Sequence, residues 1–222
     1  MTRLALFDAG GVACFPPGVV ESLQAGGMVI YPTDTLYGLG VDPRSEGGLR
    51  KLLAIKGREG KKPIPLLLDG PDRVSLWAEH VPAAGSRLME KFWPGALTIV
   101  LPAWPDVPDQ VTAGGRTVGL RVPDHPVPRA MARALGGAIT GTSANRAGNP
   151  GNWGNAEEIV REFTGEVDWV LWDGASPAAQ AAKGAAGRAP GSTVVRVEED
   201  DVTLLREGAI PFREIADFLK KG

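Results

Sequence analysis

Short apolar runs and amphipathic segments follow one another along this chain. Runs of apolar and β-branched residues predict strands over residues 28–31, 64–68, 97–101, 117–122, 138–140, 169–172, 192–197 and 202–205. Helical spacing and helix-end signals predict helices over residues 17–24, 48–56, 74–78, 82–92, 127–135, 155–163 and 211–220. Because strands and helices do not alternate strictly, the pattern favours an α/β protein with a mixed sheet over a pure doubly wound fold.

Length and local composition predict the domain organisation. A chain of 222 residues can bury a large core, and its length is typical of one domain. We expect an N-terminal extension over residues 1–25, in which residues 4–7 form an edge strand, and then a single domain over residues 26–222. Residues 175–191 are almost all Ala, Gly and Pro, and this composition predicts a mobile loop inside the domain.

Composition and charge narrow the possible functions. The high content of Gly and Pro, 30 and 19 residues, suits a protein whose loops hold a ligand. The net charge of −2 means that any affinity for nucleic acid must come from a local basic patch. Cys14 is the one cysteine, and His80 and His125 are not spaced as a metal pair, so we predict neither a disulfide nor a protein metal site. No apolar run approaches the ~18 residues of a membrane span or the core of a signal peptide, so we expect a cytoplasmic protein.

The strongest local charge signal lies between Arg50 and Lys62, where six Lys and Arg residues accompany one acid, Glu59. Such a run is often only a solvated helix end, where cations complement the helix dipole. Lys56, however, falls on the apolar stripe of the predicted helix, so its stem points inward, and an inward lysine favours an anionic partner. Arg58, just beyond the helix, adds a planar fork that suits phosphate oxygens.

A second candidate segment, residues 141–145, follows a short predicted strand. Its small residues allow backbone N–H groups to approach an anion, and Ser143 and Asn145 add a hydroxyl and an amide. The same pattern is found at ordinary junctions between a strand and a turn. Because the segment lacks the lysine of the nucleotide-binding Gly-rich loop, it does not identify a nucleotide site by itself.

Two further segments place polar groups beside predicted strands. Residues 32–40 crowd two threonines and an aspartate into a predicted turn with two glycines, where such side chains often only bond their own backbone. In residues 117–122, alternation places Thr117, Gly119 and Arg121 on one face, opposite the apolar residues. An arginine beside a threonine can pair with a carboxylate or a phosphate, although a surface salt bridge is the simpler explanation.

Together and in this order, these segments resemble the YrdC/YciO family of L-threonylcarbamoyladenylate synthases. The resemblance extends from about residue 26 to residue 210. It rests on the motifs YPTDTLYGLG (31–40), IKGREGKKPIPLL (55–67), FWPGALTIVL (92–101), VGLRVPDHP (118–126), TGTSANRAG (140–148), STVV (192–195) and LREG (205–208). An ordered series of this kind is specific to a family.

The resemblance implies a fold, a reaction and partners. The family fold is a twisted, open α/β sheet with flanking helices and a positively charged concave face. The implied reaction converts L-threonine, bicarbonate and ATP, with Mg²⁺, into threonylcarbamoyl-AMP and pyrophosphate, which makes the protein a nucleotidyltransferase. A second protein then transfers the threonylcarbamoyl group to an adenosine of certain tRNAs. Because two anions meet in one pocket, catalysis would depend mainly on positioning and fixed positive charge, without a covalent enzyme intermediate.

The resemblance also assigns roles to residues of this sequence. Catalytic roles fall to Lys56, Arg58, Ser143 and Asn145. Contacts with ATP and its phosphates fall to the same four residues together with Lys62, Thr117 and Arg206. Contacts with threonine fall to Thr33, Thr35, Arg121 and Ser192, with Arg121 on the threonine carboxylate.

Several positions depart from the family pattern. Leu67 stands where some relatives carry a histidine, so one contact with threonine is expected to be missing. Glu59 stands where proline is common, and Trp153 stands where a small hydroxyl residue is expected. The loop over residues 175–191 is longer than expected, and the sequence does not include the C-terminal second domain of longer relatives. ATP binding is therefore better supported than specificity for threonine.

Two other functions agree with the same residues. One is a module that binds tRNA or double-stranded RNA without catalysis, because a basic concave surface also suits the phosphates of structured RNA. The scarcity of aromatic residues near the basic patch argues against base stacking on single strands. The other is transfer of a carbamoyl group to a different acceptor, since related modules occur inside carbamoyl-transferring enzymes.

Overall fold

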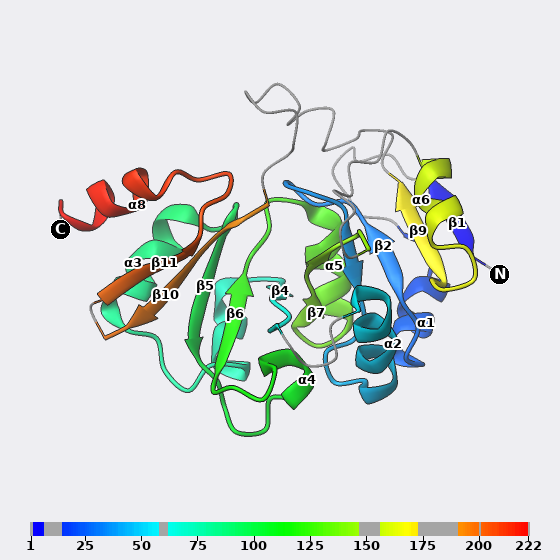
Figure 1. Cartoon of the computed structure of the whole chain (residues 1–222), viewed down its shortest axis with the longest axis horizontal. Coiled ribbons are helices and arrows are strands. Elements are labelled where there is room, and N and C mark those ends of the chain that lie inside the picture. The colour runs from blue at the N-terminus through cyan, green and yellow to red at the C-terminus, as the bar shows by residue number, and fades with distance from the viewer. Residues whose placement is uncertain are drawn as a thin grey trace.

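The computed structural model describes residues 2–6, 15–57, 62–146, 156–172, 191–199 and 201–221. Its strands belong to two mixed sheets that lie side by side, with helices packed around them (Figure 1). The predicted α/β class with mixed strand directions is confirmed, but the strands form two sheets where one was expected. In the described segments, no helix is both long and apolar enough to cross a membrane.

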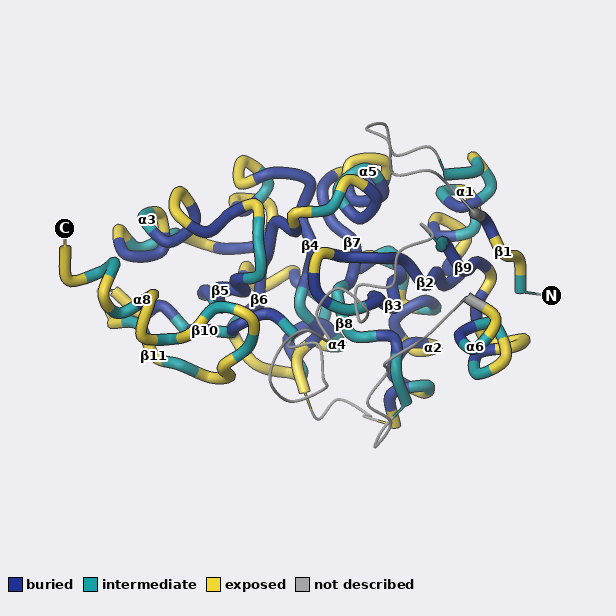
Figure 2. The backbone as a smooth tube through the Cα atoms, turned by 90° about the horizontal axis from the view of Figure 1, so that it is seen from above, coloured by how far each residue is buried: buried dark blue, intermediate teal, exposed yellow. Residues whose placement is uncertain are grey.

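The first sheet has helices on both of its faces. Its strands lie in the order β1 (Arg3–Leu6), β9 (Trp169–Trp172), β2 (Val29–Tyr31), β3 (Gly38–Gly40) and β8 (Thr142–Ser143). The first three are parallel, and β3 and β8 each run antiparallel to the strand before them in this order. Figure 2 shows the helices on the two sides, which are α1 (Gly18–Gln24) with α5 (Pro126–Ala134), and α2 (Glu46–Lys56) with α6 (Ala156–Glu162).

The second sheet presents one face to the hydrophobic core and the other to a cavity. Its strands lie in the order β11 (Asp201–Arg206), β10 (Thr193–Glu198), β5 (Leu97–Pro102), β6 (Thr117–Arg121), β4 (Leu66–Leu68) and β7 (Ala138–Thr140). Helices α3 (Ala83–Phe92) and α8 (Phe212–Leu219) belong to the same core as Ile99 and Leu120 of the sheet. Because side chains alternate along a strand, the neighbouring residues Thr98 and Gly119 point to the opposite face, where the cavity lies.

The N-terminal residues take part in the first sheet and its core. Strand β1 pairs with β9 at the outer edge of the sheet, as expected for an edge strand. In α1, Val19 and Leu23 are completely buried and pack in the same cluster as Leu135 next to α5. This segment therefore contributes apolar surface to the hydrophobic core.

The predicted helices and strands all have counterparts, with ends that shift by a few residues. A 3₁₀ helix, η1 (Pro71–Leu76), replaces the helix expected over residues 74–78. Three elements were not predicted: β3, β8 and the short helix α4 (Asp109–Thr112). The prediction of a turn with two glycines was wrong for residues 38–40, because they form β3.

The ring of Tyr31 explains why glycines occupy β3. Tyr31 pairs with Gly38 across the two strands, and its ring lies over the positions where side chains of Gly38 and Gly40 would begin. A Cβ atom at Gly38 would lie 2.6 Å from the ring, and one at Gly40 would lie 2.5 Å from it. Glycine is thus required by close packing at a strand interior, where it is otherwise unfavourable.

Tyr31 and Thr140 also join the two sheets. The buried hydroxyl of Tyr31 donates to the carbonyl oxygen of Thr140 at 2.5 Å. Burial raises the pKa of Tyr31, although the charge of Arg121 opposes this effect, so the phenol keeps its proton. Beside it, the backbone N–H of Val41 donates to Thr140 Oγ1 at 2.9 Å. The chain therefore passes from β7 in the second sheet to β8 in the first at a point that is held by several hydrogen bonds.

Replacing Gly40 with Ala is expected to destabilise the protein. The new Cβ would lie 2.5 Å from the Tyr31 ring and 2.9 Å from Ile139, and such overpacking costs about 1–3 kcal/mol. The free energy of unfolding from denaturant titration measures the effect. Gly47→Ala is the matched control, because a Cβ there meets nothing within 4 Å and alanine favours helix α2. Equal stability of Gly40→Ala and the wild type would contradict this packing.

Candidate active site

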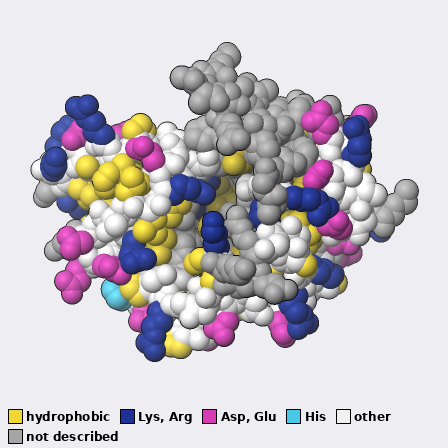
Figure 3. Space-filling model, viewed as in Figure 1, with side chains coloured by type: hydrophobic (Ala, Val, Ile, Leu, Met, Phe, Trp, Pro, Cys, Tyr) yellow, Lys and Arg dark blue, Asp and Glu magenta, His cyan; other side chains and the backbone are white. Residues whose placement is uncertain are grey.

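A cavity of about 520 Å³ lies between the open face of the second sheet and the edge of the first. Its floor comes from alternate residues of β10, β5 and β6, and its walls come from residues 33–38, 62–67 and 141–143. Figure 3 shows basic and hydrophobic side chains together around the hollow at the centre of this face. A cavity of this size accommodates a ligand as large as a drug molecule or a nucleotide.

Arg121 is the buried cation at the base of the cavity. Its side chain donates from Nε to the carbonyl oxygen of Gly95 at 2.8 Å, from Nη1 to Thr35 Oγ1 at 3.1 Å, and from Nη2 to Asp34 Oδ1 at 2.5 Å. Arg121 is only 4% exposed, so this ion pair is not the surface salt bridge that we considered. A guanidinium has five N–H groups, and the three bonds leave two for a ligand such as a carboxylate.

The two threonines of the first motif form a directed hydrogen-bond chain with Arg121. Thr33 Oγ1 lies 2.6 Å from the carbonyl oxygen of Leu36, which can only accept, so the Thr33 hydroxyl donates there. Thr35 then supplies the proton of the 3.1 Å contact between the two hydroxyls. Thr35 Oγ1 therefore accepts from Arg121 and helps to fix the guanidinium. Both threonines are buried and line the cavity.

Ser192 and Arg206, which also line the cavity, contact each other. Ser192 Oγ lies 2.8 Å from Thr98 Oγ1, and Arg206 Nη2 donates to the Ser192 carbonyl oxygen at 2.7 Å. Ser192 directly precedes β10, and Arg206 ends β11. Next to them, Gly208 packs against the backbone of Ser192, and a Cβ there would lie 2.5 Å from it. The STVV and LREG motifs are thus adjacent in space.

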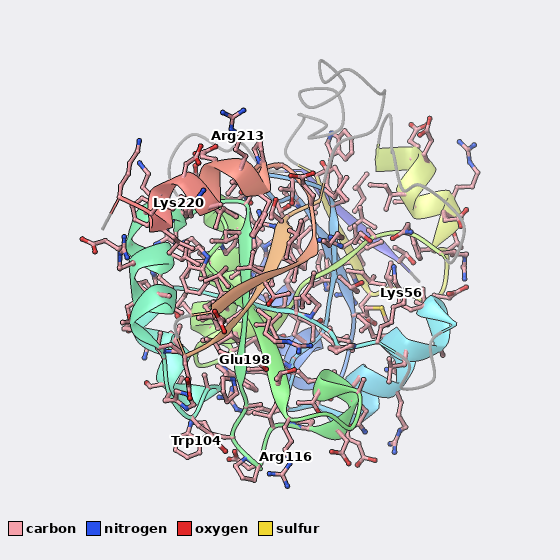
Figure 4. All side chains as sticks on the ribbon, turned by 60° about the vertical axis from the view of Figure 1, so that its left-hand side comes forward. Lys56, Trp104, Arg116, Glu198, Arg213 and Lys220 are labelled. Atoms are coloured by element: carbon pink, nitrogen blue, oxygen red, sulfur yellow. The ribbon has the colours of Figure 1, made fainter. Side chains whose placement is uncertain are left out.

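Lys56, labelled in Figure 4, is buried at the end of α2 and contacts the segment over residues 141–145. Its Nζ donates to the carbonyl oxygens of Ser143 and Asn145 at 2.9 and 2.7 Å, and to Asn145 Oδ1 at 2.9 Å. The predicted inward orientation is confirmed by its 3% exposure. These three acceptors belong to Ser143 and Asn145, and Lys56 lies behind Ser143 rather than among the residues that line the cavity.

The segment around Ser143 can offer a side-chain contact to an anion. Its backbone N–H groups largely bond within the protein, with Gly141 donating to the Pro65 carbonyl and Ala144 to the Tyr37 carbonyl, both at 2.7 Å. The N–H groups of Gly141 and Ala144 are therefore already occupied by bonds within the protein. Ser143 lines the cavity, and its hydroxyl donates to Asn145 Oδ1 at 2.5 Å.

Arg146 fastens the same segment to α6. Its guanidinium contacts Glu162 and Glu166 at 3.1 and 2.6 Å and lies over the ring of Phe163. The hydrogen bond with Glu166 raises the pKa of Arg146, and the charges of both glutamates add to the effect. The wall that carries Ser143 is thus held by Lys56 on one side and by α6 on the other.

The structure brings most of the predicted site residues into one cavity. Those that line it are Thr33, Thr35, Lys62, Thr117, Arg121, Ser143, Ser192 and Arg206. Asn145 lies behind Ser143 with Lys56. Arg58 lies outside the described residues, as do Glu59, Trp153 and residues 175–190 of the predicted mobile loop. Leu67 lines the cavity beside Gly141, where the family resemblance suggested a histidine.

Two lining residues were missed by the sequence analysis. Thr98 is 1% exposed and bonds Ser192, and Arg196 lies two residues beyond Val194 on the same face of β10. The signal for Thr98 was a hydroxyl inside an otherwise apolar strand. The signal for Arg196 was its even spacing from Ser192, because residues two apart on a strand share a face.

The fold and the cavity define a class of α/β protein with a cavity lined by basic and hydroxyl side chains on the open face of a mixed sheet. The Sua5/yciO/yrdC family model, described as "Telomere recombination", matches residues 21–208. The chain belongs to this family, which confirms the resemblance drawn from its motifs.

Individual relatives agree with this assignment. The chain is 34% identical over 194 residues to the threonylcarbamoyl-AMP synthase of Bacillus subtilis, covering 87% of this chain and 53% of that protein. It is 32% identical to the putative threonylcarbamoyl-AMP synthase of Methanocaldococcus jannaschii, covering 88% and 86% of the two chains. The solved structure of Pyrococcus abyssi Sua5 complexed with L-threonine is similar with a TM-score of 0.82 and 25% identity, over 98% of this chain and 60% of that one. The chain thus spans about half the length of the Bacillus relative.

Replacing Lys56 with Met is expected to lower the free energy of unfolding by about 3 kcal/mol, because oxygens of Ser143 and Asn145 lose their buried donor. Denaturant titration measures the change. Lys62→Met is the control: Lys62 lines the same cavity but is exposed, so its loss should change stability by less than about 0.5 kcal/mol. Equal stabilities of the two variants would contradict a structural role for Lys56.

Proposed function

We propose that this chain synthesises L-threonylcarbamoyl-AMP from L-threonine, bicarbonate and ATP and releases pyrophosphate. The observation that carries the proposal is one cavity that is lined by the buried guanidinium of Arg121, the cation of Lys62 and the side chain of Ser143. One group suits an amino-acid carboxylate and the others suit phosphate oxygens. The names of the relatives and the threonine complex of the Pyrococcus protein support the same substrates.

The reaction needs two bond-forming steps. The threonine amine adds to the carbon of bicarbonate, and loss of water leaves a carbamate. A carbamate oxygen then attacks the α-phosphorus of ATP, the bond from that phosphorus to the bridging oxygen breaks, and pyrophosphate leaves. Both partners of the second step are anions. Holding them together therefore requires fixed positive charge and accurate positioning, which a pre-formed cationic cavity provides.

The described residues divide these tasks. Arg121, already oriented by Thr35 and Gly95, uses its remaining N–H groups to hold the threonine carboxylate. Lys62 contacts the phosphates, and the Ser143 hydroxyl does so by turning its proton from Asn145 Oδ1 to a phosphate oxygen. Lys56 acts by positioning Ser143, since its bonds run to the main chain of that segment. Arg58, next to Lys56 in sequence, adds charge for the leaving pyrophosphate in this proposal.

Mg²⁺ belongs to the proposal as the companion of ATP. Among the described residues, no group of three His, Cys, Asp or Glu side chains is placed to hold a metal. Mg²⁺ generally binds through substrate phosphates and keeps several waters, and the Ser143 hydroxyl is an oxygen donor of the kind it accepts. The ion would supply neutralisation of phosphate charge.

The product is reactive, so its group must pass to an acceptor. A mixed anhydride of a carbamate and a phosphate transfers its carbamoyl group readily to a nucleophile. In this proposal a separate transferase delivers the group to adenosine of tRNA. The chain itself needs only to bind ATP, threonine and bicarbonate.

Leu67 makes the threonine side-chain subsite apolar on one side. Its side chain occupies the space above Gly141, where a Cβ would lie 2.6 Å from it. An apolar neighbour can contact the methyl group of threonine but cannot bond its hydroxyl.

Threonine and serine share the hydroxyl and differ by this methyl group, so the contact with Leu67 should favour threonine. One methyl group contributes roughly a tenfold preference or somewhat more. Calorimetry with ATP, Mg²⁺ and either amino acid measures this preference, and equal affinity for both would contradict it.

Pyrophosphate release should require L-threonine, bicarbonate and ATP together. Ser143→Ala is expected to lower kcat/KM by about tenfold to a hundredfold, because it removes a phosphate contact. Ser75→Ala is the control, since Ser75 is exposed on η1 away from the cavity. A coupled assay of pyrophosphate release measures kcat/KM of both variants.

Tight RNA binding that weakens steeply with salt, in a protein inert to ATP, would instead favour the non-catalytic alternative.

Thr35→Val is expected to raise KM for threonine about tenfold while changing KM for ATP little. The substitution removes the acceptor of Arg121 Nη1 and so loosens the group that holds the carboxylate. Steady-state kinetics with each substrate varied in turn measure the two constants. Thr203→Val on the exposed strand β11 serves as the control. A parallel rise in both constants would show that Thr35 does not belong to the threonine subsite.

A further inference from the structure

Arg196 lies in the cavity but has no role in the chemistry described above. On the cavity floor it continues a row of residues that runs across the second sheet. Arg196 pairs with Val100, and Val100 pairs with Gly119. Pro65 comes next, because a Cβ at Gly119 would lie 3.7 Å from the Pro65 Cβ. All four residues line the cavity.

The hydrogen-bonding state of Arg196 differs from that of the other arginines in the cavity. Arg121 donates to three protein oxygens at 2.5–3.1 Å, and Arg206 donates to the Ser192 carbonyl oxygen at 2.7 Å. In the part of the chain that the structure describes, Arg196 Nε is buried without a hydrogen-bond partner. The side chain of Arg196 as a whole is 43% exposed, and its one described ion pair joins Nη1 to Glu198, which is 64% exposed, at 3.7 Å. An exposed pair at that distance contributes little, so the guanidinium keeps its donors for another acceptor.

The rest of the row is apolar, and the methyl group of Thr98 lies beside Gly119. Pro65 and Val100 have no side-chain donors, and Gly119 has no side chain, so a ligand here would meet backbone and aliphatic carbon. A phosphate would lose its hydration on such a surface without compensation. A planar base, in contrast, can stack on it, and its ring nitrogens can accept hydrogen bonds from an arginine at the edge.

The spacing within the sheet also suits a nucleotide. Arg121 lies on β6, two residues beyond Gly119, and β6 is two strands away from β10, which carries Arg196. With strands about 4.8 Å apart and about 3.3 Å per residue, the two Cα atoms are roughly 12 Å apart. An amino-acid carboxylate on Arg121 thus leaves room for the α-phosphate and ribose before the base reaches Arg196.

We infer that Arg196 is a nucleobase-recognition residue. Its guanidinium donates hydrogen bonds to acceptor atoms at the edge of the ATP purine, while the ring lies on Pro65, Gly119 and Val100. This inference rests on the proposed function, because it takes ATP as the ligand of the cavity. The base, rather than the phosphates, is what Arg196 contacts.

Binding of ATP and of inorganic tripolyphosphate, both with Mg²⁺, tests this inference by calorimetry. Arg196→Gln is expected to weaken ATP binding about tenfold to a hundredfold and to leave tripolyphosphate binding unchanged, because tripolyphosphate has no base. Arg213→Gln is the matched control: Arg213 is 91% exposed on α8, has a similar pairing with Asp217 at 3.6 Å, and points away from the protein (Figure 4). It should bind both probes like the wild type.

Kinetics add a second readout. Arg196→Gln should raise KM for ATP and leave both KM for threonine and kcat at saturating ATP unchanged. Equal weakening of ATP and tripolyphosphate would show a phosphate contact and overturn the inference, as would unchanged ATP binding or a lower kcat. If the wild type releases pyrophosphate while Arg196→Gln behaves like Arg213→Gln, only this inference fails. If the wild type neither binds ATP nor releases pyrophosphate, the proposed function fails as well.

Discussion

The buried ammonium of Lys56 is the interaction on which the cavity depends. A buried charge is tolerated only when its hydrogen-bonding capacity is satisfied, and here the oxygens of Ser143 and Asn145 accept from it. The bond joins the end of α2 to a segment almost ninety residues later in the chain. It holds in place the wall of the cavity to which Ser143 belongs.

The second constraint is the unequal covering of the second sheet. Helices α3 and α8 bury one face of it, and the same strands therefore carry Ile99 and Leu120 on the core side and Thr98 and Arg121 on the other. Alternation along each strand thus makes one face a core and the other a binding surface. The first sheet adds the remaining walls where Tyr31 and Thr140 hold the two sheets together.

The arginines of the cavity are prepared for different tasks. Arg121 is fixed by three bonds before any ligand arrives, which lowers the reorganisation needed to hold a carboxylate. Arg206 is tied to the Ser192 carbonyl. Arg196, beside an apolar row, has a buried Nε–H that no described residue accepts. The three differ because each neighbourhood offers different acceptors, although the residue type is the same.

Local pattern in the sequence was sufficient for the α/β class, for nearly all helices and strands, for the inward stem of Lys56 and for the shared face of Thr117, Gly119 and Arg121. These follow from periodicity, which acts over a few residues. The tertiary structure decided that strands form two sheets, that the glycines of residues 38–40 lie under Tyr31, and that Arg196 stands beside Val100. Alternation tells which residues of a strand share a face, but which strands become neighbours depends on packing between distant segments.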